Sequence, residues 1–399
     1  MTPFKMTYTE RTAVFSLSTI LSLRMLGLFM VLPLFTLYAA HLAHATPFLI
    51  GLAMGIYGLS QAILQIPFGA LSDHFGRKKI ITLGLCIFAL GSMIAALSHD
   101  IWSLLLGRAL QGAGAVGSTI IALIADLTRP AQRTKAMAIA GITIGMSFSL
   151  AMVLGPILTA WIQVSGIFWL GVFLSIMALA ILYAFVPTPA VITKPVETTP
   201  KIQQFFTLLR HAELMYLNIG IFLLHLIFTA SFVVLPISLQ TVAGLHGNQQ
   251  WTLYFPTLLI AFLVSIACIR IAEKKHQIKY FFIGGIIVLV IAECLLWIFA
   301  HGLLLSALSI LLFFSAFSLL EAFLPSLVSR TAPPHRKGTA LGIYSCSQFL
   351  GIFAGGLLGG GLYGAGGASQ VYLFCTIIAI LWAAIAFKMK NPQYATTSH

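Results

Sequence analysis

The sequence predicts an all-α membrane protein with twelve transmembrane helices in two pseudo-symmetric six-helix bundles. Of its 399 residues, 59% are hydrophobic and 8% are charged, whereas a soluble domain has about 45 to 50% and about 25%. Apolar runs of roughly 20 residues, the length that crosses a bilayer as a helix, recur from end to end. The basic residues fall into alternate loops between these runs. A water-soluble globular protein is therefore excluded.

The apolar runs, bounded by polar residues, glycine or proline, define the individual helices. The expected spans are 12–40, 48–70, 79–98, 102–126, 135–161, 166–186, 212–240, 251–271, 280–300, 303–328, 339–362 and 370–387. The first run is too long for the apolar part of a cleaved secretory signal, so we expect it to remain as a membrane span.

The positions of Lys and Arg test this helix count, because cytoplasmic loops of membrane proteins are enriched in both residues. All of the 22 except Arg24 and Arg108 lie in the two tails, in every second loop or at the span ends that border those loops, and the intervening loops have none. One missed helix would invert this alternation. The pattern predicts that both termini are cytoplasmic. It also assigns the net charge of +13 to the inner membrane surface and not to a nucleic-acid partner.

The chain contains an internal repeat. Pro33 in FMVLPL and Pro236 in FVVLPI are separated by the same offset as Arg133 and Arg336, and this offset is close to half the chain. A duplication of this kind predicts two six-helix halves, and such repeats around a central binding site are typical of secondary transporters. The expected parts are an N-terminal bundle at 1–187, a proline-rich cytoplasmic linker at 188–211 and a C-terminal bundle at 212–399.

Three motifs point to a family. The loop after the second helix, GALSDHFGRKK at 69–79, resembles the G-x-L-x-D-R-x-G-R-K-x signature of the major facilitator superfamily, with His74 at a position where Arg is usual. RALQGAG at 108–114 resembles the R-x-x-Q-G-x-G motif of the same family. Gly155-Pro156 resembles the core of its antiporter motif, although Ile157-Leu158-Thr159 replaces the glycine-rich tail.

The segments SLRMLG, IPFG and EAFLPSL extend this resemblance along essentially the whole chain, to YajR-type members of the drug:proton antiporter branch. That subgroup has a small soluble domain after the twelfth helix. We expect this domain to be absent here, because only about nine residues follow Lys390.

The resemblance implies a cytoplasmic latch between the two halves. Asp73 would lie at the start of the eleventh helix, where an anion is stabilised by about 0.3 to 1 kcal/mol, and Arg77 would pair with Asp126. The alternative is that these charges only set the membrane topology. The expected latch residues are Gly69, Asp73, Gly76, Arg77, Asp126, Gly338 and Thr339.

Ionisable residues inside a membrane require an explanation, because each costs at least about 2.5 kcal/mol near the centre. In the family's arrangement, helices 1, 4, 7 and 10 line the cavity. The residues expected there for proton coupling or substrate contact are Arg24, Arg108, Gln111, His225 and Glu321. Glu321 is the expected proton carrier, because burial strengthens the binding of a proton to a carboxyl group and a nearby cation weakens it. A structural ion pair or substrate contact is the alternative for Glu321, and simple packing is the alternative for His225. Glu293, in the peripheral ninth helix, is expected to be structural.

Small residues in the membrane helices permit close helix approach. General membrane packing is the alternative to a specific role. The expected packing motif comprises Gly112, Gly114, Gly145, Gly155 and Pro156.

These features favour proton-coupled efflux of a lipophilic or cationic small molecule by alternating access, as in multidrug antiport across a bacterial inner membrane. The chain has no G-x-x-x-x-G-K-[ST] motif for ATP-driven pumping, and its scattered cysteines predict no metal site. We expect a monomer that uses the proton gradient and no cofactor. A proton-driven importer of a metabolite or siderophore and a non-transporting receptor are the alternatives. An intramembrane enzyme is disfavoured, because no nucleophile and base converge at depth.

Overall fold

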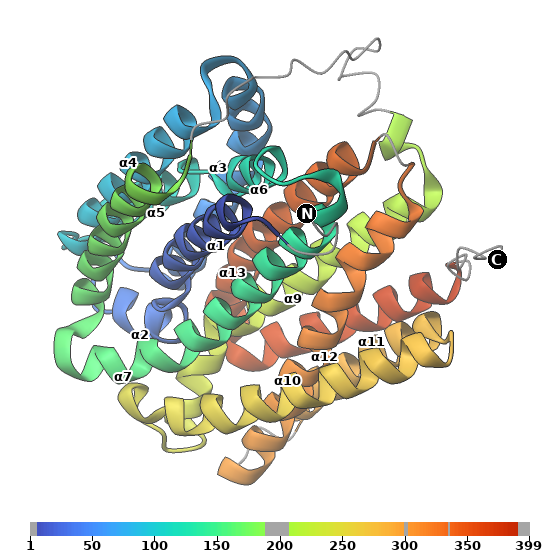
Figure 1. Cartoon of the computed structure of the whole chain (residues 1–399). Helices are drawn as coiled ribbons and strands as arrows, with labels where there is room; N and C mark the ends of the chain where they lie inside the picture. Colours follow the sequence, from blue (N-terminus) through green and yellow to red (C-terminus); the bar gives the residue numbers. More distant parts are fainter. Residues whose placement is uncertain (1–5, 188–206, 299–301, 334–335, 390–399) are drawn as a thin grey trace. The chain divides into compact units, whose positions relative to one another are not determined.

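The computed structural model describes residues 6–187, 207–298, 302–333 and 336–389 (Figure 1). The chain divides into two compact units, Met1–Ala45 with Ile56–Val196 and Thr46–Gly55 with Glu197–His399. Most of the expected linker, residues 188–206, lies outside the described residues. Within the described ranges the secondary structure is helical apart from one isolated bridge between Ala43 and Asp100.

The helices of the first half of the chain are α1 (Tyr8–Phe29), η1 (Leu32–Leu34), α2 (Phe35–Ala39), α3 (Pro47–Phe75), α4 (Arg77–Ala96), α5 (Ile101–Ala113), α6 (Gly117–Asp126) and α7 (Pro130–Phe185). Those of the second half are α9 (Ala212–Thr241), η2 (Gly247–Gln249), α10 (Trp251–Lys274), α11 (Ile278–Ile298), α12 (Leu303–Thr331) and α13 (Lys337–Phe387). In the first unit α1 packs against α7, and α4 packs against α5 and α7. In the second unit α9 packs against α13, which also contacts α11.

The helices account for the twelve predicted spans. Ten helical stretches of the described chain are long and apolar enough to cross a membrane. Two of them, α7 and α13, contain residues with non-helical backbone, at Gln163 in α7 and at Gly366 and Gly367 in α13. Each part on either side of these residues has roughly the 20 residues that a span requires. The predicted fold class is therefore confirmed.

Two predicted spans are interrupted, and this corrects the continuous helices expected over 12–40 and 102–126. The first changes from α1 to η1 around Pro33, which has no backbone N–H to donate. The second stops at Ala113 and resumes at Gly117. Between these residues Ala115 N bonds to the carbonyl of Ala113. Tight turns of this kind satisfy backbone groups that a broken helix leaves exposed.

The start of α5 is fixed by an N-cap. Asp100 Oδ1 accepts hydrogen bonds from the backbone N–H groups of Trp102 and Ser103, each at 2.9 Å. The bond from Ser103 is the main cause that lowers the pKa of Asp100 below its usual value. Such a cap satisfies donors that have no partner within the helix.

Glycine at helix crossings allows backbones to touch in the first unit. A Cβ on Gly112 would overlap the backbone carbonyl of Tyr57, and a Cβ on Gly155 would overlap that of Met30. At Gly114 the added carbon would lie 2.5 Å from Gly84 O. A Cβ on Gly145 would meet nothing within 4 Å, so no close approach explains that glycine in this structure.

Pro156 follows Gly155 inside α7 and does not interrupt it. The one residue with non-helical backbone in α7 is Gln163, several residues further along. Pro156 of the expected packing motif is therefore accommodated within the helix.

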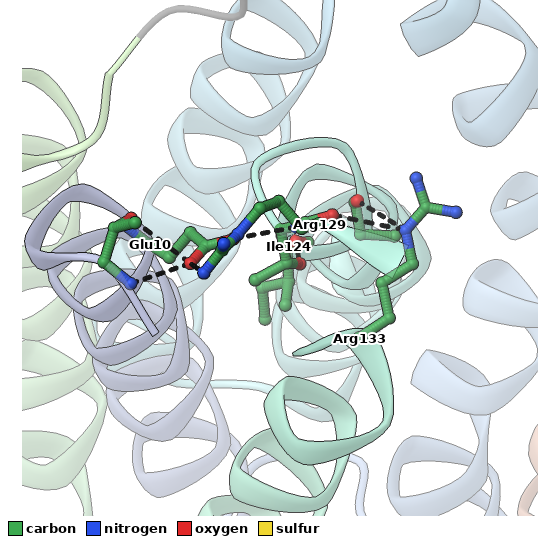
Figure 2. A network of polar contacts seen from close by, with 7 residues as sticks. Glu10, Ile124, Arg129 and Arg133 are labelled. Carbon is green, nitrogen blue, oxygen red and sulfur yellow. Dashed lines mark hydrogen bonds and ion pairs between the residues drawn. The ribbon is translucent and has the colours of Figure 1, made fainter. Parts of the chain in front are cut away.

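Glu10 joins the start of α1 to the loop before α7 within the first unit (Figure 2). Its side chain is 7% exposed, and Oε1 accepts from Arg129 N at 2.9 Å and from Arg129 Nε at 2.8 Å. Oε2 accepts from Arg129 Nη2 at 2.9 Å and from Thr7 N at 2.8 Å, and Thr7 caps α1 in return. Arg133, nearby in the same figure, donates to the carbonyl of Ala125. Both oxygens of this carboxylate thus have partners, which indicates a structural role.

Replacing Gly112 by Ala should destabilise the first unit. The new methyl group would overlap backbone and not a flexible side chain, and overpacking of this kind costs about 1 to 3 kcal/mol. We expect a lower midpoint of thermal unfolding for Gly112→Ala in detergent. Gly145→Ala is the matched control, because its methyl group enters open space. Equal midpoints for the two variants would show that the crossing at Gly112 is not tight.

Glu10→Gln should also lower stability, since the amide keeps the size of the side chain but loses its charge and one acceptor. Arg129 is 45% exposed, so we discount the charge-assisted bonds for solvent and expect a loss of about 1 to 2 kcal/mol. Unfolding monitored by tryptophan fluorescence would measure it. Glu213→Gln, in the first turn of α9, is the control, and a similar loss there would argue against the network as the cause.

Candidate functional site

Two arginines are buried inside the first unit. Arg24 on α1 is 1% exposed and Arg108 on α5 is 2% exposed. Arg24 Nη2 donates to Gln61 Oε1 at 3.1 Å. Arg108 Nη1 donates to Gln111 Oε1 at 2.7 Å, and Gln111 Nε2 donates in turn to Ser92 Oγ at 2.9 Å. Of the expected site residues, the structure therefore places Arg108 and Gln111 in one hydrogen-bonded chain.

Aromatic rings surround both guanidinium groups. Arg24 lies 5.8 Å from the ring centroid of Phe88, and Arg108 lies 4.5 Å from that of Tyr57 and 5.4 Å from that of Phe35. Cation–π contacts of this length are favourable when they are shielded from water. The acidic residues of the first 196 positions all lie at helix ends or in loops: Glu10, Asp73, Asp100 and Asp126. The interior of the first unit consequently carries positive charge.

A second polar cluster lies within the second unit, where three helices meet. It joins His225 of α9, Glu321 of α12 and Gln348 of α13. Gln348 Nε2 lies 3.1 Å from Glu321 Oε1 and 2.9 Å from His225 Nε2. Glu321 Oε2 lies 3.8 Å from His225 Nε2 and has no hydrogen-bond partner among the described residues. The two residues expected from the sequence are thus brought together by one that was not expected.

The hydrogen bonds indicate the protonation state of His225 in this arrangement. The Gln348 amide group donates to both neighbours, so Glu321 Oε1 and His225 Nε2 both act as acceptors. An imidazole that accepts at Nε2 carries its proton at Nδ1, and His225 Nδ1 lies 3.3 Å from the carbonyl of Ile221. The cluster therefore corresponds to a neutral histidine beside a carboxyl group that accepts at Oε1 in both its ionised and its protonated form.

Apolar rings form one side of this cluster. The ring of Phe317 lies 5.6 Å from that of His225 and 4.7 Å from that of Phe228. Phe228 also lies 4.6 Å from Phe232. Tyr344 on α13 is within electrostatic range of Glu321, and its buried hydroxyl has no hydrogen-bond partner among the described residues. Phenylalanine rings thus pack on the histidine side of this cluster, which suits a small molecule with an apolar body.

Glu293 lies elsewhere in the second unit, on α11, and is fully buried. Its Oε1 accepts from Ser231 Oγ on α9 at 2.7 Å, and its Oε2 has no hydrogen-bond partner among the described residues. The expected structural role for Glu293 stays a prediction.

The loop between α3 and α4 gathers charge around Arg77. Its Nη1 lies 2.6 Å from Asp73 Oδ1, and its Nε donates to Asp126 Oδ2 at 3.0 Å. The pairing of Arg77 with Asp126 implied by the family resemblance is therefore present. Gly76 has a φ of 95°, a conformation that favours glycine. A Cβ on Gly69 would meet nothing within 4 Å.

Gly338 and Thr339 lie in the first turn of α13, in the second unit. The contact of Asp73 with this turn, and with it the latch, stays a prediction.

Sequence reasoning missed the neutral partners of these charged groups. Gln61 accepts from Arg24, and Ser92 accepts from Gln111, the partner of Arg108. Gln348 and Tyr344 accompany Glu321. The available signal was a polar amide in an otherwise apolar span, which is weaker than a charge. Among the described residues, no group of three or more His, Cys, Asp or Glu side chains is placed to hold a metal ion.

Comparison with known proteins agrees with this architecture. The Major Facilitator Superfamily model matches residues 17–319 and 274–398. The inner membrane transport protein YajR of Escherichia coli (strain K12) is 44% identical over 397 residues, which cover 100% of this chain and 87% of YajR. The multidrug resistance protein MdtH of Photorhabdus laumondii subsp. laumondii is 26% identical over 361 residues, 87% of this chain and 85% of MdtH.

A solved structure has the same fold. It is a bacterial homolog of the human lysosomal transporter Spinster in an inward-facing and occupied conformation, with a TM-score of 0.77 at 14% identity and 98% coverage of each chain. Twelve apolar helices in two matched bundles, together with family similarity along the whole chain, have one consistent explanation. The chain belongs to the major facilitator superfamily and is a multi-pass secondary transporter.

Proposed function

We propose that this transporter exports small lipophilic molecules in exchange for protons, with Glu321 as the group that takes up and releases the proton. The observation that carries the proposal is the incomplete hydrogen bonding of Glu321 at a junction of three helices, beside His225 and Gln348. Glu321 Oε1 accepts from Gln348, whereas Oε2 has no hydrogen-bond partner among the described residues. A proton that binds at Oε2 therefore breaks no existing hydrogen bond.

Protonation of Glu321 changes the charge of the cluster by one unit in an apolar setting. The ionised form attracts the Gln348 amide N–H, and the neutral form attracts it less. Because Gln348 lies on α13 and Glu321 on α12, the proton changes the attraction between two helices. A ligand or proton shifts a conformational equilibrium only by its difference in affinity for the two states. The bridge through Gln348 supplies such a difference.

The direction of transport and the type of substrate are supported by similarity. MdtH is named a multidrug resistance protein, and YajR is named an inner membrane transport protein. The phenylalanine rings packed beside His225 suit an apolar molecule. The cationic substrates expected from the sequence would use Glu321 as their counter-ion. The buried arginines of the first unit would instead attract an anionic substrate.

The remaining parts of the proposal follow from the sequence. We place the protein in a bacterial inner membrane with both termini cytoplasmic, on the distribution of Lys and Arg. We propose a monomer with bundles at 1–187 and 212–399, joined by the linker at 188–211. The charge cluster of Arg77, Asp73 and Asp126 would act as a latch on the cytoplasmic side.

Glu321→Gln should abolish the effect of a pH gradient on transport, because the amide cannot exchange a proton. Purified protein in liposomes, screened with fluorescent lipophilic dyes with and without an imposed gradient, would measure this. Glu273→Gln is the matched control, because Glu273 pairs with Arg330 and its side chain is 53% exposed. Gradient-dependent flux in Glu321→Gln equal to that of the wild type would refute the proton-carrier role. Dye accumulation in right-side-out vesicles and not in everted ones would refute export.

Asp73→Asn should slow transport without abolishing dye binding. The substitution removes the charge that lies 2.6 Å from Arg77 and that the proposed latch requires. We expect a severalfold lower rate of flux and a dissociation constant close to that of the wild type. Asp100→Asn provides a loop acid as control, because asparagine also caps a helix. The latch would be rejected if the rate of Asp73→Asn matched that of the control.

A further inference from the structure

Buried polar atoms without partners gather where the fourth span is interrupted. Among the described residues, Arg24 Nε and Nη1 have no hydrogen-bond partner, and neither do the hydroxyl oxygens of Ser118 and Thr119. Ser118 and Thr119 lie in the first turn of α6. Most buried polar groups in proteins are hydrogen-bonded, so a group of exceptions in one place calls for an explanation.

Geometry links Arg24 to this turn. A Cβ built on Gly117, the first residue of α6, would lie 3.9 Å from Arg24 Nη1, and that nitrogen is the one atom within 4 Å. The guanidinium group therefore borders the start of the helix. Its other terminal nitrogen, Nη2, is held by Gln61 at 3.1 Å, which fixes its orientation.

The start of α6 supplies further donors. Its first backbone hydrogen bond runs from Ile120 N to the carbonyl of Val116. The N–H groups of Gly117, Ser118 and Thr119 precede that bond, and the first N–H groups of a helix have no acceptor within it. No side chain caps this helix. With 10 residues, α6 is long enough for its dipole to add positive potential at this end.

All of these features favour a negative group. A helix start attracts anions, and a guanidinium group forms strong charge-assisted bonds with a carboxylate. Arg108 adds positive charge nearby, since both arginines interact electrostatically with Tyr57. Phe88 lies against Arg24 at 5.8 Å and offers an apolar surface to the rest of the molecule.

We propose that Arg24 and the first turn of α6 bind the acidic group of the transported molecule, so that the substrates are small lipophilic carboxylates. This rests on the proposed function, because Arg24 is 1% exposed and an anion reaches it only in a state of the transport cycle that opens the unit. Such substrates are lipophilic, as expected from the sequence, but they are anionic and not cationic.

Three probes of one shape and different charge test the proposal: 4-fluorobenzoate, 4-fluorobenzamide and 4-fluorobenzamidine. Binding to the purified full chain in neutral detergent is measured by broadening of the fluorine NMR signal. We expect the benzoate to bind at least about tenfold more tightly than either of the others, the factor that one charge-assisted bond contributes. Equal or tighter binding of the benzamidine overturns the proposal.

Variants locate the site. Arg24→Gln removes the charge, and Gly117→Ala places a methyl group between α6 and Nη1 at an ordinary contact distance. Both should weaken benzoate binding at least about tenfold, while Arg24→Lys should retain part of it. Gly145→Ala is the matched glycine control and should bind as the wild type does. Benzoate binding that is unchanged in both Arg24→Gln and Gly117→Ala overturns the assignment.

Loss of binding must be distinguished from loss of folding, and failure of the carboxylate site from failure of proton coupling. Thermal unfolding identifies any variant that fails to fold, and if Arg24→Gln fails, Gly117→Ala and the comparison of probe charges still decide the question. Binding in detergent needs no proton gradient. Loss of the proton-carrier role in the Glu321→Gln experiment would thus refute the proposed coupling and leave the carboxylate site standing, and the converse also holds.

Discussion

The cost of placing a polar group in hydrocarbon is the constraint on which the rest of this structure depends. A charge at the centre of a bilayer costs at least about 2.5 kcal/mol, and unsatisfied backbone groups add several kcal/mol each. Glu10 lies just before the first expected span, and both of its oxygens have partners. Glu321 and Arg24 each keep one hydrogen-bonded amide partner and leave other polar atoms without one. The unbonded atoms of Glu321 and Arg24 can therefore bind a proton or a ligand without breaking a hydrogen bond.

The same constraint explains where the helices are interrupted. A break inside a membrane is tolerated where the freed backbone groups are buried in protein and satisfied locally. The turn around Ala115 does this for the end of α5, since its N–H bonds to the carbonyl of Ala113. The beginning of α6 has no such cap. The interruption thus leaves the end of α5 with a local hydrogen bond and the start of α6 without a side-chain cap. Arg24, a buried cation, lies beside this uncapped start.

Much of the fold was predictable from the sequence, because bilayer thickness dictates the length of each apolar run and the loops carry their own basic signal. The pairing of Arg77 with Asp126 was predictable only through the family motif, since nothing in the spacing of the two residues brings them together. Gln348 was not predicted, because a neutral amide in an apolar span costs less than a charge and its partners are set by packing. The break between α5 and α6 was also missed. The residues there, Gly-Ala-Val, are small and apolar and also occur in uninterrupted membrane helices.

The first unit has two arginines in its membrane helices and the second has two glutamates, and this bears on how transport and proton movement are coupled. Arg24 and Arg108 lie in the first unit, and Glu293 and Glu321 lie in the second. A cationic substrate would compete directly with the proton for Glu321. A carboxylate held by Arg24 would not, so neither ligand would displace the other from its own site. Coupling would then operate through the equilibrium between conformations, with each ligand favouring one of them, and the two effects would be reciprocal by linkage.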